Sequence, residues 1–384
     1  MNHVRRRVSG LLASLLFTAD LAIADNGKLS LQRDVDLARE KAGLVALGAV
    51  VATADKGIVA VAVSGERAKG GKNPVQDSDA WHIGSNTKML TALLYARLVE
   101  QGHARWGAAV PELFPGLSGK IHANWQEVTI EDLLSHRSGA APNASVTWMI
   151  SARFDHKPLD VQRANLAETI LASKPAGKHG EFTYSNLGYI LAGAAIEDLA
   201  KRTPDLKGKT YELLLRELVV AQGPAGAAAG FGFGPPKTGI EGHAKGLLGR
   251  TMKPQGRTND ADNPAALGPA GTVHYSLRGH ALLLLSFLDG PRALPLSIRK
   301  KLLTPYPNAN SDYALGWGVA VKNTAHGVSY GHSGSNTVWL SQVTMVPELG
   351  LVVIVNTNQM DVKAETAVSA LSKRLVEQMS AADK

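Results

Sequence analysis

Apolar residues at both ends of the chain follow the pattern of β-strands. Residues 46–53 and 58–63 are apolar runs on either side of a polar, glycine-containing turn, which predicts a β-hairpin. In the C-terminal part, strands are predicted at 315–321, 337–346 and 351–355. The last of these, Leu-Val-Val-Ile-Val, is apolar at every position, so we expect it to lie inside a sheet that helices cover on both faces.

Between these ends, apolar residues recur at helical spacing. A helix is expected to open at Ser85, because the apolar residues Met89, Leu90, Leu93, Leu94 and Leu98 share one face. Gly102 is expected to end it. Further helices are predicted at 34–41, 187–199, 211–220, 277–288 and around 368–379, with a Gly/Ala/Pro-rich loop at 222–239. Strands at both ends with helices between them predict an α/β fold with an all-α insertion, in which both termini build one sheet.

The first 24 residues have the features of an export signal. Three arginines at 5–7 precede an apolar stretch at 11–23 and an Ala-x-Ala cleavage site, although Asp20 interrupts the stretch. The stretch is too short to span a membrane, and an ordinary amphipathic helix is the alternative. We therefore expect a periplasmic or secreted protein. The expected divisions are a signal peptide at 1–24, two parts of an α/β domain at 25–109 and 308–384, and a mainly helical region at 110–307.

Composition narrows the possible classes of function. The chain is 45% hydrophobic and 19% charged, which is typical of a folded globular protein. Its formal net charge is +8, but no run of Lys and Arg with interleaved aromatics occurs, so nucleic acid is not a predicted partner. The chain has no cysteine, and its histidines show no metal-ligand spacing, so we predict neither a metal site nor a cofactor.

Ser85-Asn86-Thr87-Lys88 is the first segment that could carry chemistry. Residues three apart at the start of a helix share a face, which would place the Lys88 amine beside the Ser85 hydroxyl. A serine becomes a good nucleophile when a base removes its proton, and desolvation would leave the lysine partly neutral for that task. Alternatively, Ser85 is a helix cap and Lys88 a solvated side chain. The S-x-x-K pattern also occurs at Ser297, where this plainer explanation suffices.

Tyr184-Ser185-Asn186 is the second such segment. A phenol can pass a proton to a leaving group, and an amide can orient both the lysine and a substrate carbonyl. The alternative is a loop tyrosine beside Asn186 as a helix cap.

His332-Ser333-Gly334-Ser335 is the third segment, and we expect it just before a strand. Gly334 would let a substrate backbone approach closely, and the N–H of Ser335 could complete an oxyanion hole with that of Ser85. A plain Gly/Ser turn is one alternative. Another is the G-x-S-x-G elbow of α/β-hydrolases with Ser333 as nucleophile, although Ser335 occupies the last glycine position and a strand is predicted to follow.

In this order, the three segments resemble the motifs of the serine β-lactamase and DD-peptidase superfamily. The likeness is greatest to the branch of class C β-lactamases, DD-carboxypeptidases and related esterases, and it covers about residues 35–380. Residues 81–84, 133–139 and 269–271 are also similar. The resemblance implies an antiparallel sheet from both termini, flanked by helices, together with a helical region.

The resemblance also implies roles for the motif residues. Ser85 would be the acylated nucleophile, Lys88 its base or electrostatic partner, and Tyr184 a proton carrier, with the identity of the general base left open. Asn186 would bind the substrate amide. The segment His332-Ser333-Gly334-Ser335 would line the substrate, with His332 where many members have lysine.

The expected function is hydrolysis of an ester or amide through an acyl-enzyme. A D-Ala-D-Ala-carboxypeptidase-like or esterase activity on a small-molecule or peptide substrate, such as one derived from the cell wall, fits best. A class C-like β-lactamase is one alternative, and a penicillin-binding or sensory module with little turnover is another. The substrate depends on His332, because a histidine is only partly charged near neutral pH whereas a lysine would be a permanent partner for a carboxylate.

Overall fold

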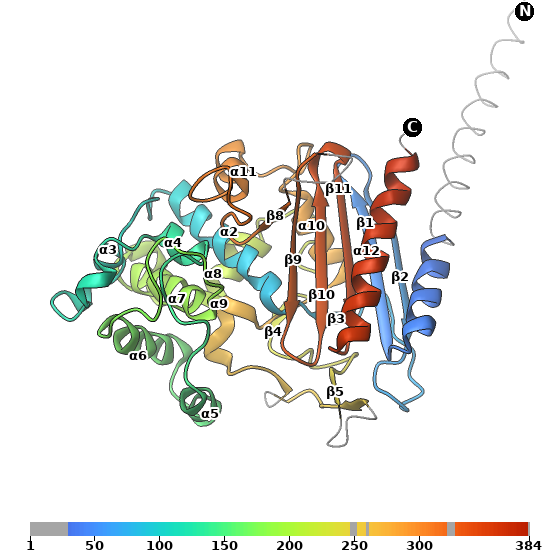
Figure 1. Ribbon diagram of the computed structural model, residues 1–384, viewed down its shortest axis with the longest axis horizontal. Coiled ribbons are helices and arrows are strands. Elements are labelled where there is room, and N and C mark those ends of the chain that lie inside the picture. Colours follow the sequence, from blue (N-terminus) through green and yellow to red (C-terminus); the bar gives the residue numbers. More distant parts are fainter. Residues whose placement is uncertain (1–29, 246–251, 259–260, 321–326, 383–384) are drawn as a thin grey trace, which may run out of the picture.

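The two ends of the chain meet in one six-stranded antiparallel sheet (Figure 1). The computed structural model describes residues 30–245, 252–258, 261–320 and 327–382. In spatial order the strands are β2 (Gly57–Gly65), β1 (Ala46–Thr53), β11 (Leu351–Thr357), β10 (Leu340–Val346), β9 (Ser329–Ser335) and β8 (Gly318–Ala320). The expected sheet from both termini is therefore confirmed, and the expected signal peptide at 1–24 lies outside the described residues.

Helices cover both faces of this sheet, as the apolar sequence of β11 predicted. Every residue of β11 is buried between β1 and β10. On one face, Val353 and its neighbours pack against α12 (Val362–Ala382) and the helix that the structure describes over residues 30–42. On the other face, Ile354 belongs to a larger core that includes α10 (Leu277–Leu285). Burial of this apolar surface on both sides is the main force that holds the sheet in place.

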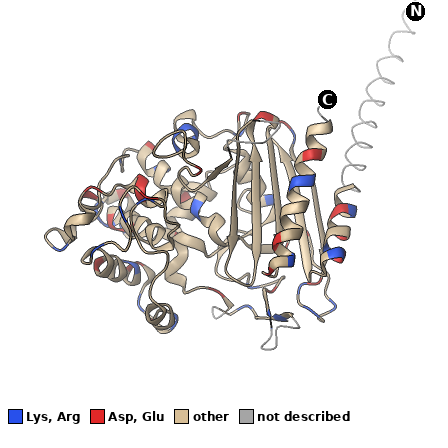
Figure 2. Ribbon diagram, viewed as in Figure 1, with Lys and Arg blue, Asp and Glu red and all other residues tan. Residues whose placement is uncertain are grey.

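Charged residues are distributed over the helices and loops rather than the large sheet (Figure 2). None of its six strands contains Asp, Glu, Lys or Arg. Blue and red segments alternate along the outer helices (Figure 2). Among the residues described here, no helix is both long and apolar enough to cross a membrane.

The helical region packs beside the edge of the sheet that β8 and β9 form (Figure 1). Its helices are α3 (Val110–Leu113), α4 (Ile130–Leu134), α5 (Val146–Phe154), α6 (Leu159–Leu171), α7 (Asn186–Arg202), α8 (Tyr211–Leu215), α9 (Gly268–Gly271) and α11 (Leu296–Leu303). The long helix α2 (Thr87–Glu100) lies between them and the sheet, and most of its residues are buried. Because α2 is enclosed in this way, its first turn is held rigidly against both halves of the molecule.

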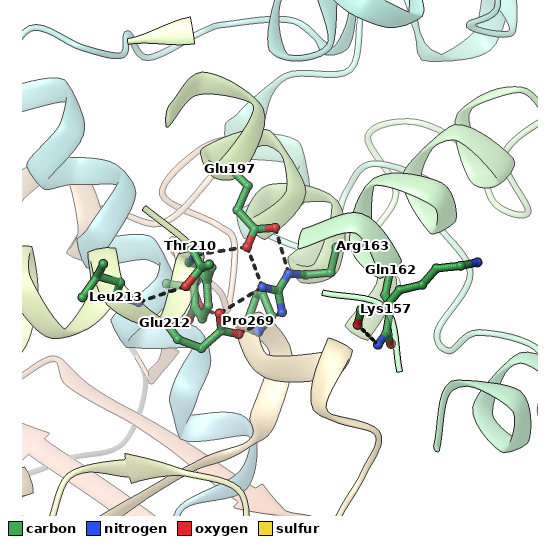
Figure 3. A network of polar contacts seen from close by, with 10 residues as sticks. Lys157, Gln162, Arg163, Glu197, Thr210, Glu212, Leu213 and Pro269 are labelled. Atoms are coloured by element: carbon green, nitrogen blue, oxygen red, sulfur yellow. Dashed lines mark hydrogen bonds and ion pairs between the residues drawn. The ribbon is translucent and has the colours of Figure 1, made fainter. Parts of the chain in front are cut away.

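A buried ion-pair network ties three of these helices together (Figure 3). Arg163 of α6 donates to both carboxylate oxygens of Glu197 in α7, at 2.9 and 2.5 Å. It also donates to Glu212 of α8 at 2.9 and 3.1 Å. The side chain of Arg163 is fully buried, and the two carboxylates raise its pKa above the usual range. The network lies next to Gly268, where α9 begins.

Several expectations about local structure need correction. Ser85 lies in a 3-10 turn, Gly84–Asn86, and α2 starts only after it. The strand expected at 337–346 begins at Leu340. The expected loop at 222–239 contributes a short strand, β4, to a second sheet that sequence patterns missed. That sheet contains β3 (Ala80–His82), β7 (Val273–Ser276) and β4 (Gly232–Phe233).

Candidate active site

Ser85 sits in the tight turn that connects β3 to α2. Two hydrogen bonds fix the turn. His82 Nδ1 accepts from Gly84 N at 3.1 Å, and the Thr87 hydroxyl donates to Gly84 O at 2.7 Å. Gly84 has a φ of +52°. A Cβ atom on it would lie 2.3 Å from the backbone nitrogen of Ser335, so both its conformation and its neighbour require glycine.

The base of this turn is held by a buried histidine–carboxylate pair. His82 Nε2 lies 2.8 Å from Asp262 Oδ2, and Asn336 donates to the other carboxylate oxygen at 2.7 Å. Because Nδ1 of His82 accepts from Gly84, its Nε2 carries the hydrogen that Asp262 receives. The second sheet, the turn that holds Ser85 and the segment after β9 are therefore joined by one set of hydrogen bonds.

Lys88 is fully buried and points at Ser85. Its Nζ lies 3.1 Å from Ser85 Oγ, 2.7 Å from Asn186 Oδ1 and 2.6 Å from the carbonyl oxygen of Ala270. All three partners are neutral, so none of them compensates a positive charge. Burial accordingly lowers the pKa of Lys88 well below its ordinary value.

Tyr184 and Asn186 form the helical wall of the site. Lys88 Nζ lies 4.9 Å from the centroid of the Tyr184 ring, and the Tyr184 hydroxyl is hydrogen-bonded with Ser85. Burial raises the pKa of Tyr184 to about 12, so its hydroxyl is protonated at neutral pH. Asn186 does not cap α7, because Ser185 does so by accepting from Gly188 N at 3.0 Å.

The opposite wall is the strand β9, not a turn before a strand as expected. Gly334 pairs with Ser341 of β10, and β9 runs against the Ser85 turn. A Cβ atom on Gly334 would lie 2.0 Å from Ile83 O and 2.7 Å from Ser85 N, so only glycine allows this contact. The close contact between the two segments brings the backbone nitrogens of Ser85 and Ser335 near each other, as an oxyanion hole requires.

The elbow interpretation of Ser333 does not fit this geometry. Ser333 lies inside β9 with an exposed side chain, and the next element is β10. A nucleophile elbow needs a sharp turn from a strand into a helix. Ser333 therefore contributes backbone to the wall of the site rather than a nucleophile.

His332 differs from the expectation that it is partly charged. Its ring is half-buried, with Nε2 at 2.9 Å from the Tyr313 hydroxyl and Nδ1 at 3.0 Å from the carbonyl oxygen of Ser333. Desolvation, together with the nearby Lys88, lowers the pKa of His332 to about 3. The imidazole is therefore neutral at physiological pH, which sequence alone could not indicate.

Two site residues were missed by the motif analysis. His136 and Tyr313 belong to an aromatic cluster with Tyr184, and the ring centroids of His136 and Tyr184 are 4.2 Å apart. His136 lies in a segment already noted as similar to the superfamily, but Tyr313 comes from an irregular stretch before β8 that carries no local signal. In the part of the chain that the structure describes, no group of three or more His, Asp or Glu side chains is placed to hold a metal ion.

Comparison with known proteins agrees with this arrangement. The family model described as Beta-lactamase matches residues 19–377. Protein flp from Staphylococcus aureus (strain COL) is 28% identical over 123 residues, which is 32% of this chain but only 24% of that protein. The chain thus matches about a quarter of the length of this relative.

Solved structures show the same fold over nearly the whole chain. A class C beta-lactamase superposes with a TM-score of 0.70 at 16% identity, covering 90% of this chain and 96% of that one. A beta-lactamase/D-alanine carboxypeptidase from Yersinia pestis gives a TM-score of 0.67 at 19% identity, covering 91% and 99%. The expected β-lactamase/DD-peptidase-like fold is confirmed.

Proposed function

Because the chain belongs to the Beta-lactamase family, we propose that it is a serine hydrolase that cleaves an ester or amide through an acyl-enzyme at Ser85. The activity we propose is D-Ala-D-Ala-carboxypeptidase-like or that of an esterase. An exported location, which rests on the signal-like residues 1–24, would bring the enzyme to peptides derived from the cell wall.

The observation that carries this proposal is the environment of Lys88. A neutral amine has two hydrogens and one lone pair. The oxygens of Asn186 and Ala270, at 2.7 and 2.6 Å, can only accept hydrogen bonds, so they take the two hydrogens. The lone pair is then left for the third neighbour, the Ser85 hydroxyl at 3.1 Å. This geometry supports Lys88 as the base that takes the Ser85 proton.

The remaining groups suit the later steps of acyl transfer. As Ser85 Oγ bonds to the substrate carbonyl carbon, the negative charge on the carbonyl oxygen would meet the N–H groups of Ser85 and Ser335. The Tyr184 hydroxyl would give its proton to the leaving oxygen or nitrogen as that bond breaks, and regain one through Lys88. Water would then attack the acyl-enzyme by the reverse proton path and release Ser85.

A hydrolysis panel with the purified protein tests the proposed activity. We expect steady turnover of a p-nitrophenyl ester or a D-Ala-D-Ala peptide, and slower turnover of nitrocefin. Faster turnover of nitrocefin would indicate a β-lactamase instead. A single stoichiometric burst with every substrate would indicate a penicillin-binding module that is acylated but does not turn over.

Replacement of Lys88 by arginine should lower kcat/KM for a neutral ester by about 10²- to 10⁴-fold, because a guanidinium cannot accept a proton at accessible pH. In the wild type, we expect kcat/KM to rise with pH and to level off well below 10.5, since burial lowers the pKa of Lys88 and only its neutral form is active. Activity is therefore lost as pH falls through this lowered pKa. A wild-type profile that still rises steeply near pH 10.5 would show that Lys88 is not the base.

Replacement of Tyr184 by phenylalanine should lower turnover by about 10²-fold or more while substrate binding changes little, because only the hydroxyl is lost. Steady-state kinetics, with KM and kcat measured separately, check this. The matched control is Tyr95→Phe, since the buried Tyr95 hydroxyl donates to Arg105 O at 2.8 Å, away from the site. Equal turnover in the two variants would make Tyr184 a structural residue.

A further inference from the structure

A chain of hydrogen bonds links the two walls of the site behind the nucleophile. It begins at the backbone N–H of Ser185, which donates to His136 Nδ1 at 3.0 Å. His136 Nε2 lies 3.3 Å from the Tyr313 hydroxyl, and this hydroxyl lies 2.9 Å from His332 Nε2. The chain ends where His332 Nδ1 meets the carbonyl oxygen of Ser333 at 3.0 Å.

The two backbone groups at its ends fix the role of Nδ1 in each histidine, and the Tyr313 hydroxyl between them also has Tyr189 as a hydrogen-bond neighbour. An amide N–H can only donate, so His136 Nδ1 accepts and its Nε2 carries the hydrogen that goes to Tyr313. A carbonyl oxygen can only accept, so His332 Nδ1 carries a hydrogen, and burial, which lowers the pKa of this ring, leaves its Nε2 without one. The Tyr313 hydroxyl then accepts from His136 and donates to His332, and both histidines are neutral.

The surroundings of His332 are consistent with this state. Its ring faces Tyr313 and Tyr184, with centroids 5.9 and 6.2 Å away, and desolvation is the main cause of its lowered pKa. Asp312 borders the same groove beside β8 and β9. His136 is another titratable group nearby, and desolvation lowers its pKa well below the ordinary value. Burial therefore opposes a charge on His332 and outweighs the hydrogen bond to Ser333 O, which favours the charged ring.

We propose that His136 and Tyr313 are positioning residues that hold His332 as a neutral ring with its hydrogen on Nδ1, so that the β9 wall selects acyl donors with no carboxylate next to the scissile bond. Within the proposed function, on which this inference rests, it favours neutral esters and amides over peptides that end in a carboxylate there. A substrate carboxylate at β9 would meet a neutral imidazole instead of a cation. Its Nε2 has no hydrogen to donate, and the hydrogen on its Nδ1 is already bonded to the Ser333 carbonyl.

The first test determines which ring nitrogens of His332 and His136 carry a hydrogen in the wild-type enzyme. Nitrogen-15 chemical shifts of the ring nitrogens, recorded from pH 5 to 8, report the tautomer and charge of each histidine. We expect His332 to keep a protonated Nδ1 and a bare Nε2 throughout, and His136 to show the opposite pattern. A His332 that takes up a second proton between pH 5 and 8 would overturn the proposal, whatever the variants do.

The second test removes one hydroxyl from the chain. Tyr313→Phe keeps the ring in the aromatic cluster but takes away the donor to His332 Nε2, so the pKa of His332 should rise above its wild-type value. The probes are a phenyl ester with a meta-carboxylate on the leaving group and the same ester with a carboxamide there. In Tyr313→Phe, the ratio of their kcat/KM values should rise in favour of the carboxylate as the pH falls from 8.5 to 5.5.

The comparison set separates this effect from general damage. The ratio should stay flat with pH in the wild type and in Tyr95→Phe, and it should be raised at every pH in His332→Lys, which supplies a permanent cation. An equal, flat ratio in Tyr313→Phe and the wild type would refute the positioning role. Labelling of Ser85 by a fluorophosphonate tests the serine mechanism separately, so its absence would refute the proposed function instead.

Discussion

Replacing Ser85 with alanine should abolish covalent labelling by a fluorophosphonate and lower turnover of the best ester by roughly 10³-fold or more. The reason is geometric, because Ser85 Oγ is the hydroxyl that Lys88 Nζ reaches, at 3.1 Å, in the turn against which Gly334 and Ser335 of β9 pack. Intact-protein mass spectrometry measures the labelling, and peptide mapping locates the adduct.

Two serines of this chain serve as matched controls for that result. Ser333 is exposed on β9 next to the site, and Ser297 is the exposed first residue of the other S-x-x-K sequence, in α11. Alanine at either position should leave labelling intact. Labelling that survives in Ser85→Ala but disappears in Ser333→Ala would move the nucleophile to β9.

Most of the large sheet was predictable, because most of its strands are apolar runs in the sequence. β1, β2 and β11 lie at or near the expected residues, since each forms part of a continuous apolar run. β9 was missed because its sequence, Ser-Tyr-Gly-His-Ser-Gly-Ser, lacks both β-branched residues and an apolar alternation. It is a strand because β8 and β10 pair with it on either side, which is a property of the fold rather than of the segment.

The short motifs located the reacting groups, but not their protonation states. Ser85, Lys88, Tyr184 and Asn186 converge as the S-x-x-K and Y-x-N patterns suggested. The neutral state of His332 could not be predicted, because it depends on Tyr313 and on burial between distant segments. His136 and Tyr313 are 177 positions apart in the chain, so no local pattern could have joined them.

Replacing Arg163 with methionine should lower the free energy of unfolding by about 3–5 kcal/mol, because it leaves a buried carboxylate without its cation. The Glu197 side chain is only 3% exposed and receives two hydrogen bonds from Arg163, whereas Glu212 is 20% exposed and can turn toward water. Urea unfolding followed by circular dichroism measures the change. The variant should also lose turnover, since α9, which holds Lys88 through the Ala270 carbonyl, lies beside the network.

A second substitution separates the unpaired charge from the lost packing. Arg163→Met combined with Glu197→Gln removes the orphaned charge, so the double variant should recover more than half of the lost stability if desolvation is the cause. On the same helix α7, the exposed pair Arg202–Asp198, 2.8 Å apart, gives the control: Arg202→Ala should change stability by at most about 1 kcal/mol. If Arg163→Met proves as mild as Arg202→Ala, water reaches Glu197 in solution and α6, α7 and α8 are held by their apolar contacts alone.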